Sequence, residues 1–262
     1  MSENQPLALV TGASSGIGLE LARQFAAHGH DLLIAAENDA IEAVAVELRT
    51  AGPAPVQVEA VQVDLATSDG VQRLYTALGA RPLGVAALNA GVGLGGAFAE
   101  NDLATELKLI DLNVKSTVHL AKLILPDLVA RNEGRILITS SIAATMPGSF
   151  QAVYNASKSF LQSFAEALQN ELSDSAVTVT SLMPGPTETN FFHRAGMDDT
   201  PVGRSSKDDP AEVAKQAYAA VMAGKDRVVA ESIMTKAQEL ANKVLPDKVK
   251  AAVHRKMAEP DS

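Results

Sequence analysis

Apolar and polar residues follow two alternating patterns along this chain of 262 residues. Short aliphatic and β-branched runs predict strands at Leu7–Val10, Asp31–Ala36, Val56–Val63, Val85–Leu88, Arg135–Thr139, Val177–Leu182 and Arg227–Ala230. Longer stretches with helical periodicity predict helices at Gly16–His28, Asp39–Thr50, Asp69–Leu78, Asp102–Ala130 (one helix or two), Val153–Leu172 and Pro210–Met222. Such alternation predicts right-handed crossovers within a parallel sheet.

Several of the predicted strands are apolar on both faces. The runs LLIAA and ILIT show no alternation of polar and apolar residues. This is typical of strands buried between two layers of helices. The expected fold class is therefore α/β, a doubly wound parallel sheet with helices on both faces. We expect residues 1–232 to form one domain and residues 233–262 an amphipathic helical extension of it.

Two regions depart from this pattern. Pro184–Asp209 is rich in Pro, Gly, Asp and Thr and lacks periodicity, as expected of a long lid or binding loop. The tail from Ile233 has apolar residues at helical spacing, interrupted by Pro246, with six Lys/Arg between Lys236 and Lys256. Three special roles are open for this tail, namely packing over a pocket, a subunit contact or binding to lipid, besides that of an ordinary surface helix.

Composition narrows the possible functions. The chain has no Cys, which excludes disulfides, thiolate zinc sites and a Cys nucleophile. Its net charge of -9 disfavours nucleic acid or an anionic membrane as the main partner. The start MSENQPLALV has no secretory signal pattern, and no apolar run reaches the ~20 residues of a membrane span. We expect a soluble cytoplasmic protein.

A glycine-rich turn follows the first predicted strand and precedes a helix. The segment Thr11–Gly18 contains Gly12, Ser14, Ser15, Gly16, Ile17 and Gly18. Glycines allow a sharp turn and close approach of a phosphate, and the helix start offers free N–H groups and its positive dipole end. This context predicts a dinucleotide site, although the spacing is Gly-x-x-x-Gly-x-Gly.

Glu37 lies just after the second predicted strand. A carboxylate there can accept hydrogen bonds from a ribose diol and would repel a 2′-phosphate. No Lys or Arg lies between Ala35 and Ala40. These features favour NAD over NADP, unless Glu37 is simply a solvated loop residue.

Three groups suited to proton transfer come after the fifth predicted strand. Tyr154 and Lys158 lie four residues apart and share one helical face, so the ammonium can favour the phenolate. Ser141 ends the fifth strand, at the sheet edge where ligands of open α/β sheets bind. Asn89-Ala90-Gly91 ends the fourth strand at that edge, and Asn113 indicates a bend or bulge in its long helix.

These motifs resemble those of the short-chain dehydrogenase/reductase family over roughly Pro6–Ala230. The matching positions are the Thr11–Gly18 loop, Asp64, Asn89-Ala90-Gly91, Asn113, Ser141, Tyr154-Asn155-Ala156-Ser157-Lys158 and Pro184-Gly185. The resemblance implies a Rossmann fold with a seven-stranded parallel sheet. It also implies a Ser–Tyr–Lys site assisted by Asn, without a metal.

The resemblance also implies a role for each residue. Tyr154 would be the general acid/base, Ser141 would bind the substrate oxygen, and Lys158 would tune Tyr154 and hold the nicotinamide ribose. Asn113 would bend its helix and anchor a water linked to Lys158. The dinucleotide would contact Gly12, Ser14, Ser15, Gly16, Ile17, Gly18, Glu37, Asp64, Leu65, Asn89, Ala90, Gly91, Tyr154, Lys158, Pro184, Gly185, Thr187 and Thr189.

One departure from the family concerns cofactor choice. NAD-preferring relatives usually carry Asp at the position of Ala36, and NADP-preferring relatives carry a basic residue at the position of Glu37 or Ser15. This chain has neither signal. The preference for NAD therefore rests on Glu37 and on the missing cation.

The main hypothesis is an oxidoreductase that moves a hydride between nicotinamide and a carbonyl or secondary alcohol carbon. The alternative is a dinucleotide-sensing binding protein on the same fold. Substrate identity is open: Met146, Phe150, Val153, Phe191, Phe192 and Met197 are candidates for an apolar pocket or for ordinary packing. The resemblance implies a homodimer or homotetramer formed through the long helices Asp102–Ala130 and Val153–Leu172. The broad apolar faces of both helices likewise predict a homo-oligomer.

Overall fold

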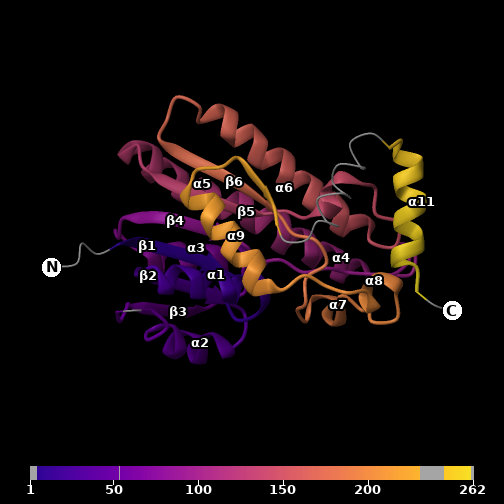
Figure 1. The fold of residues 1–262 in the computed structure, drawn as a ribbon, viewed down its shortest axis with the longest axis horizontal. Coiled ribbons are helices and arrows are strands. Elements are labelled where there is room, and N and C mark those ends of the chain that lie inside the picture. Colours follow the sequence, from indigo (N-terminus) through magenta and orange to yellow (C-terminus); the bar gives the residue numbers. More distant parts are fainter. Residues whose placement is uncertain (1–4, 53, 231–244, 261–262) are drawn as a thin grey trace.

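The structure is a computed structural model that describes residues 5–52, 54–230 and 245–260. Within these residues, seven strands form one parallel sheet with the spatial order β3-β2-β1-β4-β5-β6-β7 (Figure 1). The strands are β1 (Gln5–Thr11), β2 (His30–Ala36), β3 (Val58–Gln62), β4 (Leu83–Leu88), β5 (Gly134–Thr139), β6 (Val177–Met183) and β7 (Arg227–Val229). The strand order reverses between β1 and β4, which confirms the doubly wound Rossmann arrangement.

Helices cover both faces of the sheet and enclose two apolar cores. One core contains side chains of α1 (Gly16–Ala27), α2 (Ala40–Leu48) and α9 (Pro210–Met222). The other contains side chains of α3 (Ser68–Leu78), α5 (Ser116–Arg131) and α6 (Ala152–Glu171). The helices therefore form two layers with the sheet between them.

The strand β2 shows why its sequence lacks polar alternation. Leu32 and Ile34 point into the first core, whereas Leu33 and Ala35 point into the second. All four side chains are almost fully buried. Because successive side chains of a strand face opposite sides, a strand between two helical layers must be apolar at every position.

The predicted strands and long helices are confirmed, with boundaries that differ by one or two residues. Asp102–Ala130 forms one rod made of α4 (Leu103–Ile110), a π-helical turn η1 (Asp111–Lys115) and α5. The side chain of Asp102 caps this rod, since its carboxylate accepts from the N–H of Thr105. The irregularity expected at Asn113 is thus one wide turn.

The lid, residues 184–209, is less irregular than the sequence predicted. It contains two short helices, α7 (Phe191–Arg194) and α8 (Pro201–Arg204). Thr200 caps α8 through its hydroxyl, and Pro201 occupies the first helical position. A four-residue helix is too short to produce a periodic apolar pattern, which explains the difference.

The tail is helical after Pro246, where α11 spans Asp247–Ala258, as expected. The helix expected from Ile233 lies outside the described residues. In the parts of the chain that the structure describes, we find no helix long and apolar enough to cross a membrane. The same parts contain no group of three or more His, Cys, Asp or Glu side chains arranged to hold a metal.

Candidate active site

A cleft opens at the carboxyl edge of the sheet, near the point where the strand order reverses. Ser141 lies in it, together with every residue predicted to contact a dinucleotide. The latter are Gly12, Ser14, Ser15, Gly16, Ile17, Gly18, Glu37, Asp64, Leu65, Asn89, Ala90, Gly91, Tyr154, Lys158, Pro184, Gly185, Thr187 and Thr189. Asn113 lies behind the cleft wall and is fully buried.

The glycine loop between β1 and α1 leaves no room for side chains at two positions. Gly12 has a φ of 68°, and a Cβ there would lie 2.9 Å from the Cα of Ala90. A Cβ on Gly18 would lie 2.1 Å from the carbonyl oxygen of Gly12. The loop therefore packs tightly against the start of α1 and the end of β4, and its residues from Ser14 to Gly18 border the cleft.

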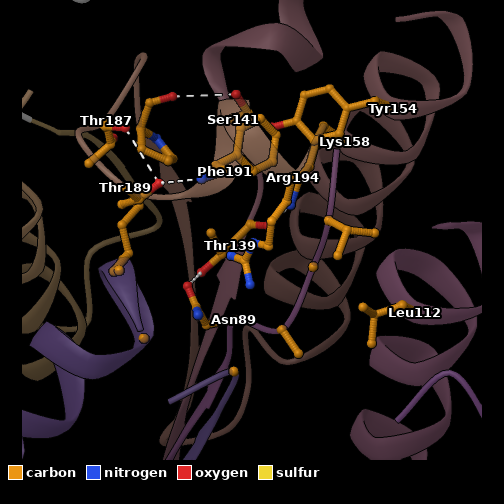
Figure 2. A pocket seen from close by; sticks show the side chains of 18 of the residues that line it. Asn89, Leu112, Thr139, Ser141, Tyr154, Lys158, Thr187, Thr189, Phe191 and Arg194 are labelled. Carbon is orange, nitrogen blue, oxygen red and sulfur yellow. Dashed lines mark hydrogen bonds between the residues drawn. The ribbon is translucent and has the colours of Figure 1, made fainter. Parts of the chain in front are cut away.

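A row of hydrogen bonds joins the ends of three strands below the cleft. The Thr11 hydroxyl accepts from the backbone N–H groups of Asn89 and Ala90 at 2.9 and 3.0 Å. The Asn89 amide donates to the Thr11 carbonyl at 3.2 Å and accepts from the Thr139 hydroxyl at 3.1 Å (Figure 2). The ends of β1, β4 and β5 are therefore fixed relative to one another by paired polar groups.

Glu37 and its neighbours stand at one end of the cleft. The carboxylate of Glu37 is 3.7 Å from the Nζ of Lys108, which comes from α4. Both side chains are more than half exposed. Next to Glu37, Asn38 donates to the Ser14 hydroxyl of the glycine loop at 3.2 Å. The structure thus places a cation beside Glu37 that the local sequence around β2 did not show.

Ser141 and Tyr154 meet on the other side of the cleft (Figure 2). Ser141 caps the 3₁₀ turn η2 (Ile142–Thr145), where its hydroxyl accepts from the N–H of Ala143 at 3.1 Å. Burial raises the pKa of Tyr154 to about 12, and the hydrogen bond from Ser141 acts in the opposite direction. The phenol therefore carries its proton at neutral pH, and the neighbouring Ser141 hydroxyl favours the phenolate.

Lys158 lies one helical turn after Tyr154 on α6 and is also buried. Its Nζ donates to the carbonyl oxygen of Thr139 at 2.9 Å and lies 5.8 Å from the centre of the Tyr154 ring. Burial lowers the pKa of this amine to about 8. The amine is thus held at the end of β5, next to the phenol.

Asn113, in the π-helical turn, supports the segment after β4. Its side-chain amide accepts from the N–H of Val92 and donates to the Val92 carbonyl, both at 2.9 Å. The same amide donates to the Ser157 hydroxyl at 3.1 Å. The wide turn therefore places one buried side chain between the wall of the cleft and α6.

The turn before α6 is fixed from inside. The Asn155 amide donates to the carbonyls of Ala143 and Met146, both at 3.2 Å. A Cβ on Gly148 would lie 2.1 Å from Cγ of Asn155, so the chain crosses directly over this side chain. Asn155, which belongs to the Tyr-to-Lys motif, therefore shapes the turn beside Ser141 and Tyr154.

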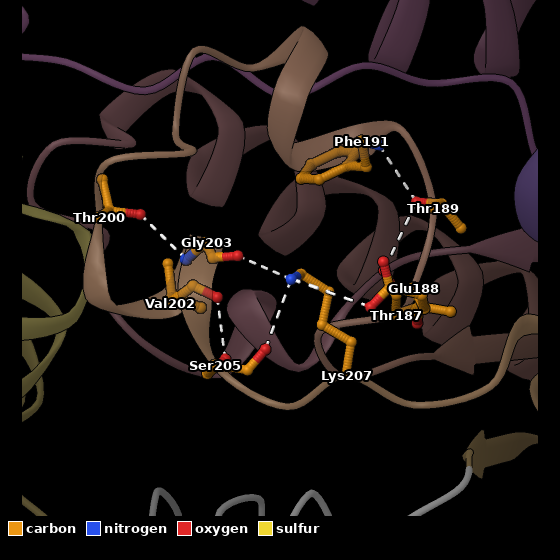
Figure 3. A network of polar contacts seen from close by, with 9 residues as sticks. All are labelled: Thr187, Glu188, Thr189, Phe191, Thr200, Val202, Gly203, Ser205 and Lys207. Carbon is orange, nitrogen blue, oxygen red and sulfur yellow. Dashed lines mark hydrogen bonds and ion pairs between the residues drawn. The ribbon is translucent and has the colours of Figure 1, made fainter.

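The lid covers the cleft from the opposite side and is braced internally. Lys207 donates to the carbonyl of Gly203 at 2.7 Å and lies 4.0 Å from the Glu188 carboxylate (Figure 3). Its ammonium also lies 5.3 Å from the centre of the Phe192 ring. The lid touches the glycine loop, because a Cβ on Gly16 would lie 3.0 Å from Cγ2 of Thr189.

The C-terminal helix α11 closes the remaining side. Ser149 donates to the Ala251 carbonyl at 3.3 Å, and Lys250 donates to the Thr145 carbonyl at 3.4 Å. His254 and Met257 of α11 line the cleft. Packing over the pocket is therefore the role that the structure gives to this part of the tail.

Sequence reasoning missed several polar residues at the site. The cleft is also lined by Asn38, Thr139, Gln151, Arg194 and His254, and Lys108 pairs with Glu37. Arg194, His254 and Lys108 come from elements far away in the sequence. Gln151 carried a usable signal, since it lies only three residues before Tyr154 at the start of α6.

Comparisons with known proteins agree with this geometry. The protein-family model described as short chain dehydrogenase matches residues 6–199 of this chain. An uncharacterized oxidoreductase of Bacillus subtilis is 29% identical over 79% of this chain and 87% of its own length. Oxidoreductase UcpA of Salmonella typhimurium is 32% identical over 79% of this chain and 76% of its own length.

Solved structures give the same result. A short-chain dehydrogenase from Sphingobium yanoikuyae, solved in complex with NADPH, superposes with a TM-score of 0.81 at 27% identity. The superposition covers 98% of both chains. Together with the match over residues 6–199, the chain is thereby shown to belong to the short-chain dehydrogenase/reductase family of oxidoreductases.

Proposed function

We propose that this chain is an NAD(P)-dependent oxidoreductase that interconverts a carbonyl and a secondary alcohol, with Tyr154 as general acid/base. The observation that carries the proposal is the meeting of Ser141, Tyr154 and Lys158 in the cleft that also contains the glycine loop. The three groups suited to proton transfer and the loop suited to a dinucleotide thus line one cavity. A protein that only senses a dinucleotide would not require these three groups next to the binding site.

The residues present fit a dinucleotide. The tight glycine loop keeps its backbone close to the cleft at Gly12 and Gly18, where any Cβ would collide with backbone atoms. Its N–H groups and the start of α1 would bind the pyrophosphate. Asp64 and Asn89 would border the two ends of the ligand, and Lys158 the nicotinamide ribose. When bound, the cofactor supplies or accepts the hydride.

Arg194 adds a positive charge to this site. Its side chain lines the cleft and, in the view of Figure 2, lies between Lys158 and Thr139. Within the described residues, its guanidinium has no hydrogen-bond or ion-pair partner. Because the lid touches the glycine loop at Thr189, we assign Arg194 to the pyrophosphate.

The proton path follows from the geometry. Ser141 donates a hydrogen bond to the substrate oxygen and holds it against the phenol of Tyr154. During reduction, Tyr154 donates its proton to the oxygen as negative charge develops there. Lys158 stabilises the phenolate that remains, since its ammonium lies beside the ring. In the reverse direction, the phenolate accepts the proton of the alcohol.

Glu37 decides the choice between the two cofactors in this proposal. Its carboxylate would accept hydrogen bonds from the adenosine ribose and would repel a 2′-phosphate. The ion pair with Lys108 holds the carboxylate at the end of the cleft. We therefore propose that NAD is preferred over NADP, although the relative from Sphingobium was solved with NADPH.

We also propose a homo-oligomer formed through α4 and α6. Exposed apolar side chains gather on these helices, with Leu103 at 68%, Leu107 at 50% and Phe160 at 46% exposed. Water-exposed apolar area of this kind is typical of protein interfaces. A monomeric mass at micromolar concentration in sedimentation would contradict this assignment.

The proposal is tested by replacing Tyr154 with Phe. Cofactor binding is measured by the fluorescence of NADH, and turnover with a panel of ketones is followed by the ultraviolet absorbance of the reduced nicotinamide. We expect unchanged binding and a loss of turnover of roughly 10²- to 10⁴-fold. Tyr218→Phe, on the distant helix α9, serves as the matched control and keeps full turnover. Binding of NADH without turnover of any ketone or alcohol by the unmodified protein would favour the sensor.

A further inference from the structure

The cleft holds a second polar group on the substrate side, away from the glycine loop. His254 of α11 is only 5% exposed and lines the cleft. Its Nδ1 lies 3.0 Å from the carbonyl oxygen of Ser149. A carbonyl can only accept, so Nδ1 carries the proton and donates it in this bond. In the neutral ring, Nε2 is then a bare acceptor.

The remaining nitrogen of His254 has no protein partner among the described residues. Burial lowers the pKa of His254, so the imidazole is neutral at neutral pH. Since Nδ1 is occupied by Ser149, Nε2 is the polar atom that the ring can offer to the cleft. Because this nitrogen borders the cleft, a ligand that excludes water there must supply a donor, or the acceptor is left unpaired at a cost in free energy.

Gln151 is a second polar residue that lines the cleft, and it follows Ser149, the partner of His254, by two positions. It belongs to the turn that starts at Gly148, whose carbonyl accepts from the Gln151 N–H at 3.0 Å, and Ser149 of the same turn holds His254. The Gln151 side chain is 7% exposed, lines the cleft and has no hydrogen-bond partner among the described residues. It is the N-cap residue of α6 and precedes Tyr154 by three positions.

The surroundings of these two groups are apolar. Met146, Phe192, Val202 and Met257 line the same cleft, and Met257 lies one helical turn after His254 on α11. A ligand there must satisfy a bare acceptor and a primary amide without bringing a charge. A hydroxyl can donate to the imidazole and accept from the amide, whereas a carboxylate cannot donate. An ammonium would be buried there without a counter-charge.

We propose that the substrate is an apolar carbonyl or alcohol compound that carries a second hydroxyl group, which His254 and Gln151 bind. The inference rests on the proposed function, because the first oxygen is the one held by Ser141 and Tyr154. Gln151 and Tyr154 are three positions apart at the start of α6, and both line the cleft. The second hydroxyl therefore lies on the same molecule as the reacting carbon, separated from it by a short carbon chain.

The test uses pairs of ketones in which a terminal hydroxyl replaces a methyl group of similar size. Suitable pairs are 4-hydroxy-2-butanone with 2-pentanone, 5-hydroxy-2-pentanone with 2-hexanone, and 6-hydroxy-2-hexanone with 2-heptanone. The ratio of kcat/KM within each pair is measured with saturating NADH or NADPH. We expect the hydroxylated member to be favoured by roughly tenfold or more in at least one pair, since its absence leaves buried polar groups unpaired.

Three variants locate this preference. His254→Leu and Gln151→Leu should each bring the ratio close to one, mainly by lowering kcat/KM of the hydroxylated ketone. His254→Gln, which keeps an acceptor, should retain part of the preference. His193→Leu is the matched control, since His193 is exposed and pairs with Asp198 outside the cleft, and the ratio should stay unchanged. Melting temperature and NADH binding verify that each variant is folded.

The outcomes separate this inference from the proposed function. If the ketone without a hydroxyl group reacts as well as its hydroxylated partner in every pair, the inference is wrong while the enzymatic function stands. The same holds if the preference persists in both Leu variants. If no ketone or corresponding alcohol reacts, the proposed function fails and the inference fails with it.

Discussion

The floor and the roof of the cleft satisfy their polar groups in opposite ways. The floor comprises the strand ends with Thr11, Asn89, Thr139 and Lys158, where each polar side chain is paired with another protein group. The roof comprises the turn 146–151, the lid and α11. There, Gln151, Arg194 and the Nε2 of His254 line the cleft without protein partners among the described residues.

This difference separates two tasks. Paired groups hold their positions whether or not a ligand is bound, which suits a catalytic arrangement that must be in place before the reaction. Unpaired groups gain hydrogen bonds only when a ligand arrives, which suits recognition. In the proposed function, the floor therefore serves the reaction and the roof serves the recognition of ligands.

The largest expected effect concerns two adjacent serines of the floor. Ser141→Ala removes the donor that holds the substrate oxygen, so kcat should fall by about 10²- to 10³-fold. Ser140→Ala is the neighbouring control, because the Ser140 hydroxyl donates to the Lys158 carbonyl at 2.9 Å and acts on structure only. Single-turnover rates and thermal melts of both variants check this. Equal losses of kcat in the two would show that the floor acts as a scaffold and not through Ser141.

A smaller effect is expected at the adenosine end of the cleft. Glu37→Gln removes the repulsion of a 2′-phosphate and frees Lys108 to bind it. Charge-assisted hydrogen bonds contribute about 1.5–3 kcal/mol, so the ratio of NADP to NAD affinity should rise roughly 10- to 100-fold. Calorimetric titration with both cofactors measures it, with Glu42→Gln on α2 as control. An unchanged ratio would mean that Glu37 is a solvated loop residue.

Arg194 of the roof should show a modest effect on affinity. Because this side chain is exposed, its pairing with a pyrophosphate is worth about 1 kcal/mol. Arg194→Ala should therefore weaken NADH binding about fivefold and reduce its salt dependence. His193→Ala, on the same short helix, should leave both unchanged. A raised substrate KM with unaltered NADH affinity would place Arg194 on the substrate instead.

The smallest effect is a pH dependence of stability at Lys158. Burial lowers its pKa from 10.5 to about 8, so between these values the unfolded chain binds more protons than the folded one. Lys158 should therefore raise the free energy of unfolding of the protein by about 1 kcal/mol between pH 8 and pH 9. Urea denaturation of the unmodified protein and of Lys158→Met compares the slopes. Identical slopes would show that the folded state holds this amine charged throughout the range.

The floor could be predicted from the sequence and the roof could not. Gly12, Asn89, Ser141, Tyr154 and Lys158 each follow the end of a strand or open a helix, so strand order alone brings them together. Their positions depend on local geometry and on the topology of a parallel sheet. Both are encoded in short motifs and apolar periodicity.

The roof depends on how irregular segments pack. His254 reaches the cleft because α11 packs on the turn at Ser149 and on α8, and no periodicity predicts that contact. Lys108 reaches Glu37 from another layer of the molecule. Contacts between side chains far apart in sequence, with no strand pairing to fix their register, are beyond what one sequence reveals.

Asn113 has a consequence for the free energy of ligand binding. Its side chain makes both hydrogen bonds that a neighbouring peptide group would offer to Val92, so it takes the place of a paired backbone beside the segment that follows β4. The backbone at Gly91 and Val92 is thereby immobilised in advance, and little conformational entropy is left to lose when a ligand settles on it. An Asp at this position would have nearly the same shape but no N–H to donate, so even this isosteric exchange would release the segment.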